Sequence, residues 1–258
     1  MNPTEEWHLD TRRIGRRVLV FDCLDSTNTQ AAALAGDPAN DGLVVLAHEQ
    51  TAGRGQHGRT WQCAPGTGVL LSVLLFPPPL LRRPALLTAW ASVSVCETIL
   101  HRTGLQARIK WPNDLLIHGR KVCGILIEQA RGTVAGLGLN VNQTAEDFTR
   151  AGLTEAGSLA VFTCQPLDSQ QVARLLIGRL DEEYDRLCRG DLASLEARWQ
   201  EQIGLVGESV AAECQDGTHR GRLVELGWDG LLLEGAGGVL RRLAPETVKH
   251  LQPGPGDR

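Results

Sequence analysis

Apolar residues in the first 140 positions gather in short runs, and glycine-rich or polar segments separate these runs. The runs Arg17–Leu24, Leu43–Ala47 and Val69–Phe76 have the length of a buried strand, about four to eight residues. Three segments have the apolar spacing and length of long helices. A fourth segment is shorter, and the capping side chains before it predict the start of a helix. Strands are also predicted at Gln106–Trp111, Leu115–His118, Lys121–Gln129 and Thr133–Val141, and helices at Asn28–Ala35, Pro84–Arg102, Asp168–Arg189 and Leu192–Ile203. Gly104 could close the helix that begins at Pro84, and Gly119-Arg120 could form a tight turn before Lys121.

The pattern changes after Gly204. Glu208–Leu251 is a series of short strand-like runs that glycines interrupt, at Gly217, Gly221, Gly227, Gly230 and Gly235. This is typical of a small β-barrel appended to a larger domain. The sequence therefore predicts an α/β (α+β) fold with a mixed sheet over residues 1–204 and a small β domain over residues 205–252.

Composition excludes several classes of protein. The net charge is −4 and the pI about 6.0, which does not support a basic surface for nucleic acid. None of the seven cysteines forms a CxxC pair, so neither a zinc ribbon nor a dithiol redox motif is expected. The longest apolar run, Val69–Phe76, stops at Pro77 and is too short to cross a bilayer. We expect a soluble cytoplasmic protein with reduced cysteines and no membrane partner.

The segment Gly53–Arg59 combines glycines with two arginines and a histidine, and it formally matches GxGxxG. A dinucleotide-binding fold would need a helix directly afterwards, and Thr60–Gly66 does not predict one. A flexible surface loop is the simple alternative. The cationic side chains favour a loop that closes on a carboxylate or phosphate.

Four other segments carry candidate chemistry, each with a simpler structural alternative. Lys110–Asp114 offers an ammonium, an amide and a carboxylate for phosphate and Mg²⁺, but it is also consistent with a core tryptophan and a turn. Asp25–Asn28 is consistent with a helix cap, and Lys121 within Arg120–Glu128 with a surface charge. The glycines of Gly136–Asn142 are consistent with close strand packing.

Taken in order, these segments resemble the biotin protein ligase family, from about Val18 to Asn142. The glycine–arginine loop and the KWPND segment at Lys110–Asp114 are specific in combination. The C-terminal strands resemble the SH3-like domain of that family. The resemblance implies an enzyme that uses ATP to convert biotin to biotinyl-adenylate and transfers biotin to a lysine of a biotin-carrier domain of a carboxylase.

The resemblance also implies roles for individual residues. Catalysis would fall to Lys121, Arg54 and Lys110. Biotin would contact Ser26, Thr27, Asn28, Gln50, Arg54, Gly55, Gln56, Lys121 and Gly124. ATP would contact Arg59, Trp61, Lys110, Asn113 and Asn140, and Mg²⁺ would be held by Asn113 and Asp114.

The sequence departs from the family in two places. Gln56 stands where a second arginine is usual, which changes the charge available to hold the adenylate. His57 or Arg59 could supply that charge. About two dozen residues precede Ser26, too few for the DNA-binding winged helix of some members, so no DNA partner is expected. A homodimer is left open. Competing interpretations are a lipoate–protein ligase and a biotin-sensing adaptor without transfer activity.

Overall fold

The computed structural model describes residues 2–254, apart from the side chain of His57. It contains a large mixed sheet and a smaller antiparallel sheet. The large sheet comprises β1 (Glu5–Trp7), β2 (Val18–Leu24), β3 (Val44–Gln50), β4 (Gly68–Leu75), β5 (Arg108–Lys110), β6 (Asp114–Ile117), β7 (Arg120–Gln129) and β8 (Thr133–Asn140). The helices are α1 (Thr27–Ala33), α2 (Pro84–Thr103), α3 (Ala145–Arg150), α4 (Leu159–Thr163), α5 (Ser169–Cys188) and α6 (Leu192–Ile203).

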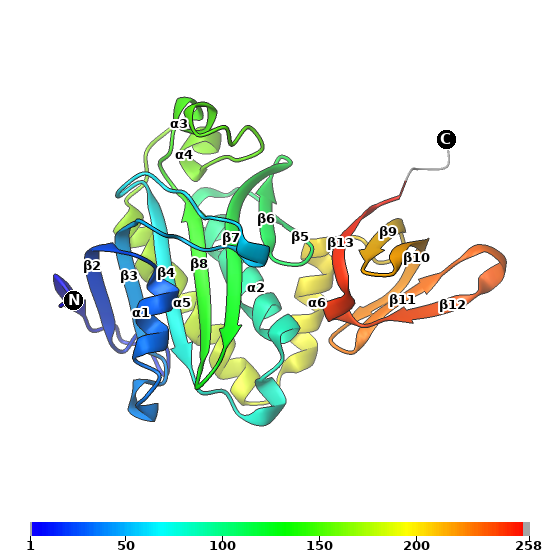
Figure 1. Ribbon diagram of the computed structural model, residues 1–258, viewed down its shortest axis with the longest axis horizontal. Coiled ribbons are helices and arrows are strands. Elements are labelled where there is room, and N and C mark those ends of the chain that lie inside the picture. Colours follow the sequence, from blue (N-terminus) through cyan, green and yellow to red (C-terminus); the bar gives the residue numbers. More distant parts are fainter. Residues whose placement is uncertain (1, 255–258) are drawn as a thin grey trace.

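The large sheet has the strand order β1-β2-β3-β4-β8-β7-β6-β5, and only β2 and β3 pair in parallel. Its strands alternate between two buried faces. In β2, Val18 and Val20 pack in the core that contains α2 and α5, whereas Leu19 and Phe21 pack in the core of α1. Figure 1 shows α1 in front of the sheet and α2 and α5 behind it. Because both faces of these strands are covered, their sequences are apolar at nearly every position rather than at every second position.

Local signals placed most of these elements where the sequence predicted them. Gly104 ends α2 in the left-handed conformation, with φ of 73°. His118 and Gly119 both have positive φ and form a two-residue hairpin between β6 and β7, in which Ile117 pairs with Arg120. The prediction at Gln106–Trp111 was too long, since only Arg108–Lys110 is a strand. The short elements β1, α3 and α4 were not predicted.

The second sheet contains β9 (Ser209–Cys214), β10 (Gly217–Gly227), β11 (Gly230–Glu234), β12 (Leu240–Leu243) and β13 (Val248–Pro253), in the order β12-β11-β10-β9-β13. No ladder joins β12 to β13 within residues 2–254. The expectation that Gly221 interrupts a strand was wrong, because β10 runs through it. The predicted combination of a mixed-sheet domain and a small C-terminal β module is confirmed.

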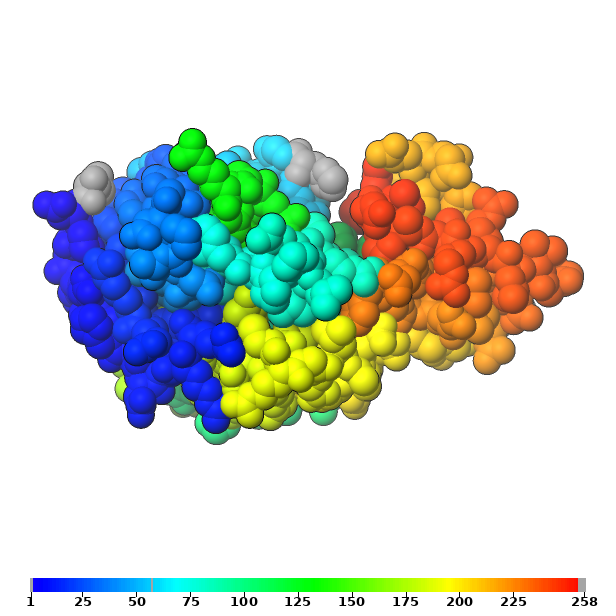
Figure 2. All heavy atoms as spheres, turned by 90° about the horizontal axis from the view of Figure 1, so that it is seen from below, coloured from blue at the N-terminus to red at the C-terminus, as the bar shows by residue number. Residues whose placement is uncertain are grey.

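Tryptophan side chains connect the two sheets. Trp111 Nε1 donates to the carbonyl of Val248 at 2.7 Å. The Trp199 ring of α6 lies 5.8 Å from the Trp111 ring and stacks on Trp228 at 4.9 Å. Figure 2 shows the C-terminal sheet, in orange and red, as a lobe at one end of the main body. The contacts hold β13 beside the segment that contains Lys110 and Asp114.

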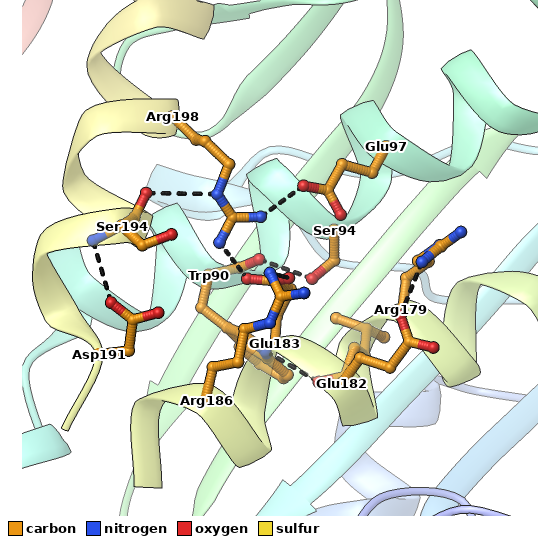
Figure 3. A network of polar contacts seen from close by, with 11 residues as sticks. Trp90, Ser94, Glu97, Arg179, Glu182, Glu183, Arg186, Asp191, Ser194 and Arg198 are labelled. Atoms are coloured by element: carbon orange, nitrogen blue, oxygen red, sulfur yellow. Dashed lines mark hydrogen bonds and ion pairs between the residues drawn. The ribbon is translucent and has the colours of Figure 1, made fainter. Parts of the chain in front are cut away.

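Ion pairs around one buried carboxylate hold the helices behind the sheet together. Arg198 of α6 donates to Glu97 of α2 and to Glu183 of α5, and Arg186 donates to the same Glu183 at 2.9 Å (Figure 3). Glu183 is buried, so two guanidinium partners compensate its charge. No helix in the described part of the chain has the length and apolar character needed to cross a membrane.

The segment before β2 is anchored to α5 by carboxylates. Asp181 accepts the backbone N–H groups of Arg12, Arg13 and Ile14 at 2.7–2.8 Å. The hydrogen bond from Arg12 makes the largest contribution to lowering the pKa of Asp185. The ion pairs of Asp185 therefore stabilise the fold above its ordinary pKa, and this contribution is lost as the pH falls through the lowered value.

We expect Asp181→Ala to lower the free energy of unfolding by about 2 kcal/mol, because it removes a buried acceptor from three backbone donors. Urea denaturation measures this loss. Glu182→Gln is the matched control, since Glu182 pairs with Arg179 on the exposed side of α5 and should contribute less than about 0.5 kcal/mol. Equal losses in the two variants would contradict the anchoring role.

Candidate functional site

The face of the sheet that carries α1 also carries a cavity of about 290 Å³. Even-numbered residues of β8, and of β7 from Gly124 onwards, point to this face, and the segment between β3 and β4 crosses in front of them (Figure 1). Every residue predicted for the site lines this one cavity: Ser26, Thr27, Asn28, Gln50, Arg54, Gly55, Gln56, Arg59, Trp61, Lys110, Asn113, Asp114, Lys121, Gly124 and Asn140.

Neutral polar side chains form the floor of the cavity. The backbone N–H and the hydroxyl of Thr27 donate to Gln50 Oε1 at 2.7 and 3.0 Å. Ser72 Oγ of β4 donates to Asn28 Oδ1 at 2.5 Å and lies 2.7 Å from Thr27 Oγ1. The capping interpretation of Ser26 is wrong in one respect: it occupies the N-cap position of α1, but its side chain makes no capping hydrogen bond. The floor is therefore a preorganised set of donors and acceptors for an uncharged polar group.

The glycine–arginine segment folds back on itself over the cavity. Trp61 N–H donates to the Gly53 carbonyl at 2.9 Å, and Gly55 N–H donates to the Arg59 carbonyl at 2.7 Å. Residues Gln56–Gly58 form a single 3₁₀ turn, and no α-helix follows. This agrees with the rejection of a dinucleotide fold. The suggestion that His57 supplies the charge missing at Gln56 refers to a side chain outside the described residues.

Two glycines of neighbouring strands provide a flat surface for Trp61. Gly124 and Gly138 are register partners in β7 and β8. A Cβ atom at Gly138 would lie 2.4 Å from Trp61 Cε2, and one at Gly124 would lie 2.9 Å from Trp61 Cζ3. The indole therefore packs directly against the backbone. Trp61 Nε1 is buried and has no hydrogen-bond partner among the described residues.

Cationic side chains surround the cavity. Lys121 Nζ lies 2.6 Å from Asp114 Oδ1 and 5.5 Å from the centroid of the Trp61 ring. Arg54 Nη2 donates to Glu128 Oε2 at 2.8 Å. These cations lie beside the neutral floor, so the cavity can bind a ligand with a polar head and an anionic end.

Asn140 and Asn113 differ in how many of their amide atoms have hydrogen-bond partners in the protein. Asn140 is buried, donates to the Gly157 carbonyl at 3.0 Å and accepts from Gln143 at 2.9 Å. Both ends of this amide thus have protein partners. Asn113 donates to the Ile125 carbonyl at 2.7 Å, which fixes the amide so that its oxygen remains available to a cation. Asp114 places a carboxylate beside this amide, and its Oδ1 atom is paired with Lys121. Carboxylate and amide oxygens are ligands of the kind that Mg²⁺ accepts.

Sequence reasoning missed four polar residues at or beside the cavity. Ser72 and Glu128 bind floor residues, whereas Lys249 and His250 reach the cavity wall from β13 of the second sheet. A sequence signal was available for Lys249. Of the 26 lysine and arginine residues only three are lysine, and all three line this cavity. The other basic side chains are arginines, so the compact ammonium groups of this chain are confined to the cavity.

The cysteines near the cavity are not nucleophiles. Burial raises the pKa of Cys63, which accepts a hydrogen bond from Gln143 at 3.1 Å. Burial also raises the pKa of the Cys123 thiol. Both thiols are therefore neutral near pH 7, and thiolate catalysis is not expected of them.

Cys214, Asp216 and His219 lie close together in the second sheet. Arg241 Nη1 lies 3.0 Å from His219 Nδ1, and His219 Nε2 lies 3.0 Å from Asp216 Oδ1. Since a guanidinium only donates, Nδ1 accepts and Nε2–H donates to the carboxylate. The hydrogen bond from His219 lowers the pKa of Asp216. Hydrogen bonding thus accounts for this group without a metal ion.

The chain is similar in sequence to known biotin protein ligases. Residues 20–142 match the Biotin/lipoate A/B protein ligase family. The bifunctional ligase/repressor BirA of Bacillus subtilis (strain 168) is 32% identical over 231 residues, which cover 87% of this chain and 71% of that protein. The biotin–[acetyl-CoA-carboxylase] ligase of Mycobacterium tuberculosis (strain ATCC 25618 / H37Rv) is 30% identical over 229 residues, which cover 83% of each chain.

A solved structure has a similar fold. The structure of a biotin protein ligase from Aquifex aeolicus in complex with biotin and ATP aligns with a TM-score of 0.78 and 25% identity. The alignment covers 92% of this chain and 99% of the Aquifex chain, so it includes the C-terminal sheet.

Proposed function

Because the chain belongs to the biotin protein ligase family, we propose that it activates biotin with ATP to form biotinyl-adenylate and transfers biotin to a lysine of an acceptor protein. One observation carries this proposal. A single cavity combines a neutral polar floor at Ser26–Asn28 with the cations Lys121 and Arg54 in its wall. The floor suits the uncharged ureido head of biotin, and the cations suit its carboxylate and the ATP phosphates.

The first step joins two negatively charged groups. Lys121 and Arg54 would neutralise the repulsion between the carboxylate of biotin and the α-phosphate of ATP. Lys110 and Lys249 line the same cavity and would screen the remaining phosphates. Asn113 and Asp114 would hold Mg²⁺, which supplies charge neutralisation on the phosphate oxygens. Bond formation between carboxylate and phosphate releases pyrophosphate.

The second step needs protection of the mixed anhydride from water. The segment Gly53–Trp61 covers the cavity and would exclude water until the acceptor amine arrives. The amine attacks the carbonyl carbon, an amide bond forms, and AMP leaves with the electron pair of the broken C–O bond. We propose a biotin-carrier domain of a carboxylase as acceptor and the cytoplasm as location, which the seven free thiols support.

Pyrophosphate release tests the proposal. The protein is incubated with ATP and Mg²⁺ together with either biotin or lipoate, and transfer of labelled biotin to a purified carrier domain is then measured. Biotin-dependent release followed by transfer is expected. Lipoate-dependent release would instead identify a lipoate ligase, and release without transfer would identify an adaptor that only activates its ligand.

Gln56→Arg should slow the dissociation of biotinyl-adenylate by about tenfold. Gln56 lines the cavity within the covering segment. A charge-assisted hydrogen bond to the phosphate contributes about 1.5–3 kcal/mol, against about 1 kcal/mol for a neutral amide, and about 1.4 kcal/mol corresponds to one decade. The dissociation rate of labelled adenylate is the measurement. Gln56→Glu is the opposite-charge control and should speed release, and an unchanged rate in both variants would mean that position 56 does not contact the ligand.

A further inference from the structure

Glu128 connects the floor of the cavity to the segment that covers it. Its Oε2 atom accepts two hydrogen bonds, from Asn28 Nδ2 at 2.7 Å and from Arg54 Nη2 at 2.8 Å. Asn28 belongs to α1 and Arg54 to the glycine–arginine segment. One carboxylate oxygen therefore joins two parts of the site that make no direct hydrogen bond to each other within the described residues.

The contact with Asn28 fixes the orientation of a buried amide. Asn28 is 4% exposed, so its donor and its acceptor both need protein or ligand partners. Glu128 takes the donor, and Ser72 satisfies the acceptor Oδ1. If the carboxylate moved, the amide of Asn28 would lose the partner that determines which of its ends faces β7.

The contact with Arg54 uses only part of a guanidinium. Nη2 binds Glu128, whereas the other N–H groups of the fork remain for a further acceptor. The ion pair is half exposed, at 45% for Arg54 and 37% for Glu128, so solvent weakens it. Arg54 is thus oriented by Glu128 and can still turn toward a ligand anion.

We propose that Glu128 is a positioning residue that couples occupation of the floor to the placement of Arg54. This inference rests on the proposed function for the identity of the ligand. A head group bound at Asn28 holds the amide in place and thereby holds the carboxylate that orients Arg54. The guanidinium then meets the carboxylate or phosphate of the same ligand with less loss of freedom.

Limited trypsin digestion tests the tether without any ligand, since trypsin cleaves after Arg54 and Arg59. Glu128→Gln keeps an oxygen that can accept from Asn28 but removes the charge that holds Arg54. Cleavage in this segment should become about threefold faster. Glu155→Gln removes the same charge from an exposed side chain and should leave the rate unchanged. Equal rates in wild type and Glu128→Gln would overturn the tether.

Biotin affinity tests the coupling. Asn28→Ala, Arg54→Ala and the double variant are compared in the wild-type background and in the Glu128→Ala background. In the wild-type background, the fold loss of biotin affinity in the double variant should differ by about fivefold from the product of the two single-variant losses. In the Glu128→Ala background, the loss in the double variant should equal that product. Multiplicative losses in both backgrounds would overturn the coupling.

A KM-against-kcat comparison separates positioning from a general structural role. Glu128→Gln should have a biotin KM between those of wild type and Glu128→Ala, because the Asn28 contact is kept and the Arg54 ion pair is lost. Failure of wild type to release pyrophosphate with biotin would refute the proposed function, and the trypsin result would still decide the tether. Release by wild type together with a wild-type biotin KM in Glu128→Gln would refute the positioning role alone.

Discussion

Lys121→Ala should slow biotinyl-adenylate formation by about 100- to 1,000-fold, the effect of removing one preorganised charge from a transition state. Lys121 Nζ is held 2.6 Å from Asp114 and over the Trp61 ring, so it is already fixed in the wall of the cavity. Without it, the carboxylate approaches the α-phosphate with its repulsion only partly screened. Biotin-dependent pyrophosphate release is the measurement.

The loss should occur in a folded protein. Lys121 and Asp114 keep 34% and 20% of their side-chain surface exposed, so this ion pair contributes less than about 1 kcal/mol to the free energy of unfolding. Urea denaturation checks this. Lys121→Arg keeps the charge and should recover part of the rate. Wild-type pyrophosphate release from folded Lys121→Ala would contradict the catalytic assignment.

Gly136→Ala should raise the KM for biotin by about 100-fold. The added Cβ would lie 2.1 Å from Asn28 Oδ1, and no real Cβ contact is so close. Asn28 must therefore leave its place between Ser72 and Glu128, which breaks two hydrogen bonds on the cavity floor. Overpacking of this kind costs about 1–3 kcal/mol, which a domain of ordinary stability survives.

Gly178→Ala is the matched control for this glycine. Gly178 lies in α5, and an added Cβ would meet nothing within 4 Å. Because alanine is a better helix former, the change should leave the KM unaltered and raise the free energy of unfolding by about 0.5–1 kcal/mol. If Gly136→Ala bound biotin as tightly as wild type, Asn28 would have no part in head-group binding.

The sequence by itself determined the elements and the order of the motifs. Apolar runs bounded by glycine and proline predicted the strands from Arg17 to Val141, because a strand covered on both faces needs apolar residues at nearly every position. Capping and turn residues placed the end of α2 at Gly104 and the hairpin before β7. These signals act over a few residues, so they can be read along the chain.

Only the tertiary structure decided which side chains meet. Glu128 follows Asn28 by 100 residues, and no local pattern announces that its carboxylate binds both Asn28 and Arg54. Along the sequence the glycines at 136 and 138 are consistent with strand packing, whereas in the structure they make room for Asn28 and Trp61. Lys249 reaches the cavity only because Trp111, Trp199 and Trp228 hold the second sheet against the first. Such contacts depend on strand order and on the packing of distant elements, which are set when the whole chain folds.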